Sequence, residues 1–342
     1  MNGRPSHLVP NQEPATSGQR TTSPAAPASS PAGKIPGRET DGPAVATSAL
    51  TKRFGERLAV DAIDIELPSG VVSGFVGPNG AGKTTTIQML LGLVRPTGGT
   101  ARVLGHPVGH PAAYLDRVGA LVESPSFYPT LSGRRNLEVL TRLGRLDRAR
   151  IGEVLALVEL GDRADDLVRT YSLGMKQRLG VAAALLPDPE LVILDEPANG
   201  LDPAGIREIR RLLRRLSDEG VTVFVSSHQL AEIETICDHL VMIHQGRIVF
   251  QGKVDDLLAA QHSDLIAIPE HSKDLVKLAE LCEQEGKAAH VDGDVLRVQA
   301  SGDWAAELNR RAMAAGITLR GLQSTRASLE EAFFAVTERK DR

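Results

Sequence analysis

The chain has 342 residues, of which 42% are hydrophobic and 24% charged, and its formal net charge at pH 7 is -4. This length suits roughly two domains with cores of their own, and the small net charge without a block of like charges argues against nucleic-acid binding. Cys237 and Cys282 lack the spacing of a metal or redox site, and no signal peptide or run of about 18 apolar residues is found, which together predict a cytoplasmic chain.

Residues 1–43 are rich in proline, serine, threonine and alanine and poor in large apolar side chains. Such a segment cannot bury a core, so we expect a disordered extension. Whether it is a plain flexible extension or a docking tail stays open. From residue 44 to about 258, apolar strand runs alternate with helical patterns, which predicts a mixed α/β domain.

A glycine-rich loop lies between the first buried strand of this domain and a helix. The apolar run 71–76 predicts the strand, and the helix follows the loop. Glycines let backbone N–H groups approach phosphate oxygens, the helix start adds its dipole, and Lys83 adds a positive charge near the terminal phosphates. The predicted binding site for a nucleoside triphosphate comprises Gly77, Pro78, Asn79, Gly80, Ala81, Gly82, Lys83, Thr84 and Thr85.

Residues 129–186 are predicted to form a helical subdomain within the α/β domain. Leu137, Leu140, Leu143 and Leu146 recur every three residues, a spacing that is typical of a helix. Arginines alternate with isoleucine and leucine at 207–215, which indicates the solvent-exposed side of a further helix rather than a nucleic-acid patch.

Two later strands end in polar residues suited to act on a triphosphate. The strand predicted at 191–194 leads into Asp195 and Glu196, whose side chains face opposite ways on an extended chain. We expect Asp195 to hold Mg²⁺ with the Thr84 hydroxyl, and Glu196 to polarise the water that attacks the γ-phosphate. The next apolar strand leads to His228, which we expect at the same sheet edge, within reach of the γ-phosphate.

Residues 259–342 are predicted to form a small α+β accessory domain. Strand, helix, hairpin, helix and strand are expected in the order of a ferredoxin-like split β-α-β unit. A last helix begins at Ser328 and contains Phe333 and Phe334. The sequence of this region shows no cluster of residues suited to catalysis, so regulation, dimer contact and stability all stay open as roles. The expected elements lie at 265–268, 274–284, 292–293, 304–314 and 317–322.

The segment 171–178, Tyr-Ser-Leu-Gly-Met-Lys-Gln-Arg, resembles the signature motif of ABC-transporter ATPases. The glycine loop, the strand with the paired carboxylates, the turn at 199–202 and His228 follow the order and spacing of that family. The resemblance therefore covers about residues 45–255. It implies an ABC-type P-loop NTPase fold with a helical subdomain, ATP and Mg²⁺ as cofactors, and ATP hydrolysis.

In proteins that resemble this chain, two such domains pack head to tail, and each nucleotide lies between one glycine loop and the partner's signature helix. The resemblance therefore assigns Ser172 and Gly174 to the nucleotide of the second domain, where a helix start favours a γ-phosphate. Phe54 matches the aromatic residue on which adenine stacks. Asp202 matches the turn residue that communicates between the two sites. Whether the two domains are identical or only homologous stays open.

Three positions depart from the usual family pattern. Leu173 and Met175 replace a glycine and a glutamine of the signature but leave its serine and second glycine intact. Glu123 stands where most members carry glutamine, and its carboxylate can still contact Mg²⁺ or the attacking water. The Glu123 variant and the loop after it resemble the subgroup that exports bacitracin and lantibiotic peptides.

The resemblance predicts an ATP-hydrolysing subunit of an exporter, bound to the inner face of the cell membrane through separate ABC-2-type permease subunits. Drug, peptide antibiotic and lipid stay open as substrates. The alternatives are a soluble ABC ATPase of translation or DNA repair and a weakly hydrolysing regulatory module. A single glycine loop and no sustained heptads disfavour the first alternative. The intact Lys83, Asp195 and Glu196 disfavour the second.

Overall fold

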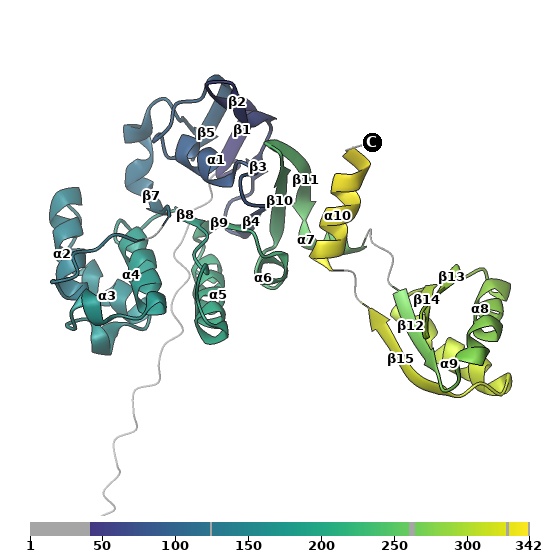
Figure 1. Cartoon of the computed structure of the whole chain (residues 1–342). Helices are drawn as coiled ribbons and strands as arrows, with labels where there is room; N and C mark the ends of the chain where they lie inside the picture. The colour runs from purple at the N-terminus through teal and green to yellow at the C-terminus, as the bar shows by residue number, and fades with distance from the viewer. Residues whose placement is uncertain (1–41, 124, 260–263, 326–327, 341–342) are drawn as a thin grey trace, which may run out of the picture. The chain divides into compact units, whose positions relative to one another are not determined.

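The computed structural model describes residues 42–123, 125–259, 264–325 and 328–340 (Figure 1). Residues 1–41 of the segment expected to be disordered lie outside these described ranges. Ser124, in the loop after Glu123, also lies outside them. Within the described ranges, no helix is both long enough and apolar enough to cross a membrane.

The first sheet is antiparallel and is built mainly from the start of the chain. Its strands run in the order β2-β1-β5-β6, and β3 pairs with the start of β1. Apolar side chains of this sheet, among them Val45, Leu50 and Val60, are fully buried. The strands are β1 (Val45–Phe54), β2 (Arg57–Ile63), β3 (Glu66–Leu67), β5 (Gly98–Val103) and β6 (His106–Pro107).

The second sheet has the order β11-β10-β4-β9-β8-β7 and is parallel from β10 to β7. Every residue of β4, β8 and β9 is buried, as expected for short apolar runs in a parallel sheet. Expected strands at 71–76, 191–194 and 221–226 are confirmed within one or two residues. The bounds are β4 (Val72–Val76), β7 (Val118–Leu121), β8 (Leu191–Asp195), β9 (Thr222–Ser227), β10 (His239–His244) and β11 (Arg247–Lys253).

Helices connect the parallel strands, as a mixed α/β fold requires. In α5, Ile209, Leu212, Leu213 and Leu216 are buried, while Arg207, Arg211 and Arg215 lie on its other side. The arginine-rich stretch is therefore an amphipathic helix, as expected. The helices around the parallel sheet are α1 (Lys83–Leu90), α5 (Pro203–Asp218), α6 (Leu230–Glu234) and α7 (Val254–Ala259).

Three helices, α2 (Gly133–Gly144), α3 (Arg150–Leu157) and α4 (Leu173–Leu185), contact one another and form the helical subdomain (Figure 1). The leucine periodicity predicted α2 correctly but ran past its end. Arg145 adopts a left-handed conformation (φ 54°), which ends the helix before Leu146. Single 3₁₀ turns lie at Pro111–Ala113, Leu115–Arg117, Gly161–Arg163, Val168–Thr170, Ser272–Asp274 and Gly302–Trp304.

Residues 264–325 form a separate four-stranded antiparallel sheet in the order β13-β14-β12-β15, with a core of its own. The last strand begins at Leu319 rather than at 317, because the Ile317 N–H closes the preceding helix by donating to the Ala312 carbonyl (2.8 Å). The elements are β12 (Asp264–Pro269), α8 (Leu275–Gln284), β13 (Ala289–Asp292), β14 (Val295–Gln299), α9 (Ala305–Ala314) and β15 (Leu319–Thr325).

The last helix, α10 (Leu329–Lys340), packs against α6, α7 and β11 of the first domain rather than joining the accessory sheet. Leu329, Ala332 and Phe333 belong to the same core cluster as the parallel sheet and the helical subdomain. The Leu329 N–H also donates to the Glu234 carboxylate at 3.2 Å. The end of the described chain is therefore part of the core of the first domain.

Candidate active site

The glycine loop between β4 and α1 follows a path that excludes side chains. A Cβ on Gly77 would lie 2.2 Å from the Ile243 carbonyl oxygen, and one on Gly82 would lie 2.6 Å from the Ala59 carbonyl oxygen. Gly82 is also left-handed, with φ 110°. Lys83 is 5% exposed, and its ammonium donates to the Gly77 carbonyl at 2.7 Å. The loop thus folds tightly around the lysine.

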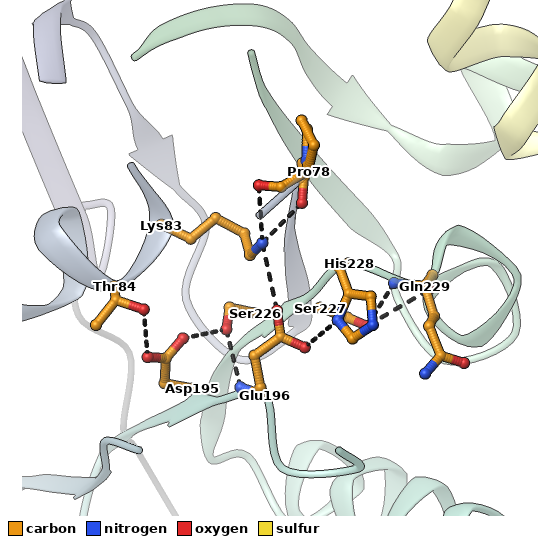
Figure 2. A network of polar contacts seen from close by, with 10 residues as sticks. Pro78, Lys83, Thr84, Asp195, Glu196, Ser226, Ser227, His228 and Gln229 are labelled. Atoms are coloured by element: carbon orange, nitrogen blue, oxygen red, sulfur yellow. Dashed lines mark hydrogen bonds and ion pairs between the residues drawn. The ribbon is translucent and has the colours of Figure 1, made fainter. Parts of the chain in front are cut away.

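Asp195 ends β8 beside the first turn of α1 (Figure 2). The Thr84 hydroxyl donates to its Oδ2 at 2.7 Å, and the Ser226 hydroxyl donates to its Oδ1. Among the described residues, no three His, Cys, Asp or Glu side chains gather in a way that could hold a metal. One carboxylate and one hydroxyl suit a cation that takes its other ligands from phosphate and water, as Mg²⁺ does.

The Glu196 carboxylate lies between the Lys83 ammonium and the His228 imidazole. Its Oε1 is 3.3 Å from the Lys83 ammonium, and its Oε2 accepts a hydrogen bond from His228 Nδ1 at 2.7 Å (Figure 2). Its backbone is left-handed (φ 52°), a conformation uncommon outside glycine, and its N–H donates to the Ser226 hydroxyl at 2.9 Å. The turn after β8 therefore aims the carboxylate at the glycine loop.

A cavity of about 470 Å³ opens over this network, within the size range of small-molecule sites. Phe54 stands at its edge with 49% of its surface exposed, and the Lys52 ammonium lies 4.8 Å from the ring centroid. The Lys52 ammonium therefore covers one face of the Phe54 ring. The cavity is lined by Phe54, Arg57, Ala59, Asn79, Gly80, Gly82, Lys83, Thr84, Thr85, Glu196, Asn199 and His228.

The structure brings most of the predicted binding residues to this cavity or directly beneath it. The carbonyl groups of Gly77 and Pro78 accept hydrogen bonds from the Lys83 ammonium, and Ala81 is buried. Four further predicted residues lie neither at the cavity nor directly beneath it. Ser172 caps α4 by accepting from the Met175 N–H, and Asp202 caps α5 by accepting from the Gly205 N–H. The others are Gly174, near Leu201, and Glu123, exposed after β7 with φ 61°.

Sequence reasoning gave no role to Arg57, Ala59, Asn199 or Ser226. Ser226 links Asp195 to the backbone of the following residue, and its position at the end of an apolar strand was a signal for this role. For Arg57, the hairpin that follows Phe54 could have indicated a place opposite the aromatic ring, although not the position beside Gly80. A turn of two residues places Arg57 directly opposite the aromatic ring in the β1-β2 ladder.

The carboxylate of Glu232 lines a hollow that shares Glu196 with the cavity. Glu232 is 7% exposed, and its Oε1 has no hydrogen-bond partner among the described residues. Burial raises the pKa of Glu232, while the charges of Arg210 and His228 act against that rise and the Glu196 carboxylate adds to it. A small hollow of about 20 Å³, large enough for one water, is lined partly by Glu196, Arg210 and Glu232.

Comparison with known proteins agrees with this geometry. The family model described as ABC transporter matches residues 60–199. The bacitracin transport ATP-binding protein BcrA of Bacillus licheniformis is 40% identical, over 84% of this chain and 95% of the relative. The daunorubicin/doxorubicin resistance ATP-binding protein DrrA of Streptomyces peucetius is 35% identical, over 86% of this chain and 92% of the relative.

A solved structure of the ATP-binding subunit of an ABC transporter is 28% identical, with a TM-score of 0.57, and covers 63% of this chain and 92% of its own. The mixed α/β fold expected from the sequence is thereby confirmed for the first domain. Near-complete coverage of a relative at 40% identity shows the family as well. This chain belongs to the ATP-binding proteins of ABC transporters and carries their ATPase domain.

Proposed function

We propose that this chain hydrolyses ATP to drive export of a peptide antibiotic or a cytotoxic drug through separate membrane subunits. The observation that carries the proposal is the Lys83, Glu196 and His228 network at the carboxyl ends of the parallel strands. The names of the similar proteins, bacitracin transport and daunorubicin/doxorubicin resistance, support export as the process and these compounds as the substrate class.

Binding of ATP follows from the shape and charge of the cavity. Backbone N–H groups of the glycine loop and the start of α1 hold the phosphates, and Lys83 neutralises the terminal ones. Phe54 offers its open ring face to adenine. Thr84 and Asp195 would hold Mg²⁺ through oxygen atoms, and when bound the ion neutralises charge on the transferred phosphoryl group.

Hydrolysis is assigned to the carboxylate and imidazole that meet beside the glycine loop. Glu196 takes the proton of the attacking water, and His228 orients Glu196 and contacts the γ-phosphate. The water oxygen bonds to the γ-phosphorus while the bond from that phosphorus to the β,γ-bridging oxygen breaks, so the products are ADP and inorganic phosphate. Glu123, in the bend after β7, contributes a second carboxylate toward the metal or the water.

A second ATP-binding domain completes the site. Ser172 and Gly174 stand at the exposed start of α4, where N–H groups and the helix dipole suit the phosphates of a partner's nucleotide. Asp202 caps the start of α5. It lies near the start of α4, because the neighbouring Leu201 is next to Gly174. We propose a dimer of this chain in which each nucleotide lies between one glycine loop and the other α4.

Membrane coupling is assigned to permease subunits of the ABC-2 type at the inner face of the membrane. Tyr128, in the loop between β7 and α2, exposes 60% of its surface, and Asn136 fixes that loop by accepting from the Tyr128 N–H at 2.8 Å. An aromatic side chain held outward in this way suits insertion of a helix from a partner protein.

The test is a resistance assay in a sensitive bacterium that expresses this chain with the permease genes of its own genome. We expect tolerance to bacitracin, a lantibiotic or an anthracycline, and loss of that tolerance with Glu196→Gln. The permease should also co-purify with both forms of the chain. A chain that recruits no multi-span membrane protein and confers tolerance to none of these compounds would contradict the proposed export role.

A further inference from the structure

Arg57 is a cation of the nucleotide cavity that lies outside the sequence motifs described above. Its side chain lines the cavity, and its Nη2 lies 3.8 Å from the position that a Cβ on Gly80 would take. Neither a hydrogen bond nor an ion pair engages the Arg57 side chain within the described ranges of the chain. We propose that Arg57 binds the phosphate chain of the nucleotide, an inference that rests on the ATP site proposed above.

The β1-β2 hairpin determines where this guanidinium stands. Phe54 and Arg57 are register partners across the hairpin, so their side chains leave the ladder on the same face. Gly55, left-handed at φ 57°, allows the two-residue turn between them. The element that presents the adenine platform therefore also presents the arginine, and a shift of one would move the other.

The position of Arg57 indicates which part of a nucleotide it meets. Phe54 marks the base end of the cavity, and Gly80 belongs to the loop that wraps the phosphates. The Arg57 guanidinium lies against Gly80, so it faces the phosphate chain rather than the base. A guanidinium there can donate two parallel hydrogen bonds to phosphate oxygens.

Charge in the cavity favours the same assignment. The Lys83 ammonium already has the Glu196 carboxylate 3.3 Å away and the Gly77 carbonyl 2.7 Å away. Arg57 has neither kind of partner, so a polyphosphate meets its charge without displacing another group. Its burial by the ligand also excludes water, which strengthens the interaction.

Arg53 provides a matched control on the same hairpin. Its guanidinium donates to the Glu56 carbonyl at 3.1 Å, and its side chain does not line the cavity. Both arginines are exposed, so loss of either changes the net charge and the solvation of the surface alike. A difference between the two variants therefore reports the place of the charge rather than its amount.

The experiment is calorimetric titration of the full chain with Mg-ATP, Mg-ADP, AMP and adenosine. We expect Arg57→Ala to weaken binding of ATP and ADP about tenfold, since charge-assisted hydrogen bonds are lost, and to leave adenosine unaffected. Arg57→Lys should recover part of the loss, and Arg53→Ala should match the parent. Arg57→Gln, which keeps most of the side-chain length, separates loss of charge from loss of packing, and circular dichroism verifies folding.

Two results would overturn the role of Arg57. One is parent-like affinity of Arg57→Ala for ATP, and the other is equal weakening of adenosine and ATP, which would make Arg57 a support for the base platform. Lys83→Ala, titrated in parallel, tests the ATP site itself. If Lys83→Ala loses affinity while Arg57→Ala does not, the site stands and only the inference about Arg57 fails.

Discussion

The Lys83 ammonium lies 3.3 Å from Oε1 of Glu196, so the cation expected to meet the terminal phosphates is paired with the carboxylate expected to activate water. Both side chains are largely buried, at 6% and 21% exposure, and the pair is therefore weakly screened by solvent. Phosphate oxygens that approach Lys83 compete with Glu196 for it. Nucleotide binding and release of the carboxylate are thus linked through one ammonium group.

This linkage predicts the effect of Lys83→Ala on nucleotide binding. The variant removes the charge that faces the terminal phosphates, so affinity for Mg-ATP should fall at least tenfold, by about 1.4 kcal/mol or more. Calorimetric titration measures it directly. Lys273→Ala, a surface change in the accessory domain, is the control and should bind as the parent does. Unchanged affinity of Lys83→Ala would reject the glycine loop as the phosphate site.

Glu196→Gln separates binding from turnover. The amide keeps the shape of the side chain and its hydrogen bond with His228 but cannot take a proton, so kcat should fall by about 10² or more. ATP should be retained, because the charge that competes for Lys83 is gone, and the ATP-bound dimer should persist in size-exclusion chromatography. Phosphate release assays measure kcat, with Glu270→Gln as a surface control. Hydrolysis at the parent rate would remove Glu196 from the role of base.

The sequence predicted the parallel strands well because each is a continuous apolar run that ends in chemically distinctive residues. Asp195 and His228 were expected at one edge of the sheet, and the pairing of β8 with β9 brings the ends of their strands there. Contacts between distant segments were less predictable. The packing of Phe333 in the first domain and the position of Arg57 beside Gly80 depend on tertiary folding, which neither periodicity nor a local motif encodes.

Glu123→Gln tests whether the unusual carboxylate after β7 contributes to metal binding. A carboxylate ligand holds Mg²⁺ more tightly than an amide, so the variant should need a higher Mg²⁺ concentration for half-maximal ATPase activity. Activity at saturating Mg²⁺ should change less than this concentration does. ATPase assays over a range of Mg²⁺ concentrations measure both quantities, with Glu138→Gln in α2 as control. An unchanged Mg²⁺ dependence would exclude Glu123 from the metal site.

Glu232→Gln should stabilise the protein at neutral pH. Burial raises the pKa of Glu232 above its ordinary value of 4.5, so the folded state favours the protonated form. That favourable contribution is complete below about pH 4.5 and is lost as pH rises through the raised folded-state pKa. The advantage of the neutral amide should therefore be present at pH 7 and 8 and shrink as the pH approaches 4.

Thermal unfolding of both forms between pH 4 and 8 measures this difference. A variant that is less stable than the parent at neutral pH would show that Arg210, His228 and a water in the adjoining hollow compensate the ionised carboxylate. The change in stability caused by Glu232→Gln at neutral pH has opposite signs in the two cases. Its sign therefore shows whether the ionised Glu232 carboxylate destabilises or stabilises the folded protein.

Phe333→Ala tests the anchoring of α10 in the first domain. Phe333 is 9% exposed, belongs to the core cluster of the parallel sheet, and contacts the His244 ring edge-on at 6.1 Å between centroids. Its truncation should destabilise the first domain by about 3 kcal/mol. Phe334→Ala is the matched control, because that neighbouring ring is 64% exposed, and its effect should stay within about 0.5 kcal/mol. Urea unfolding followed by circular dichroism measures both, and equal effects of the two substitutions would show that α10 is not anchored through Phe333.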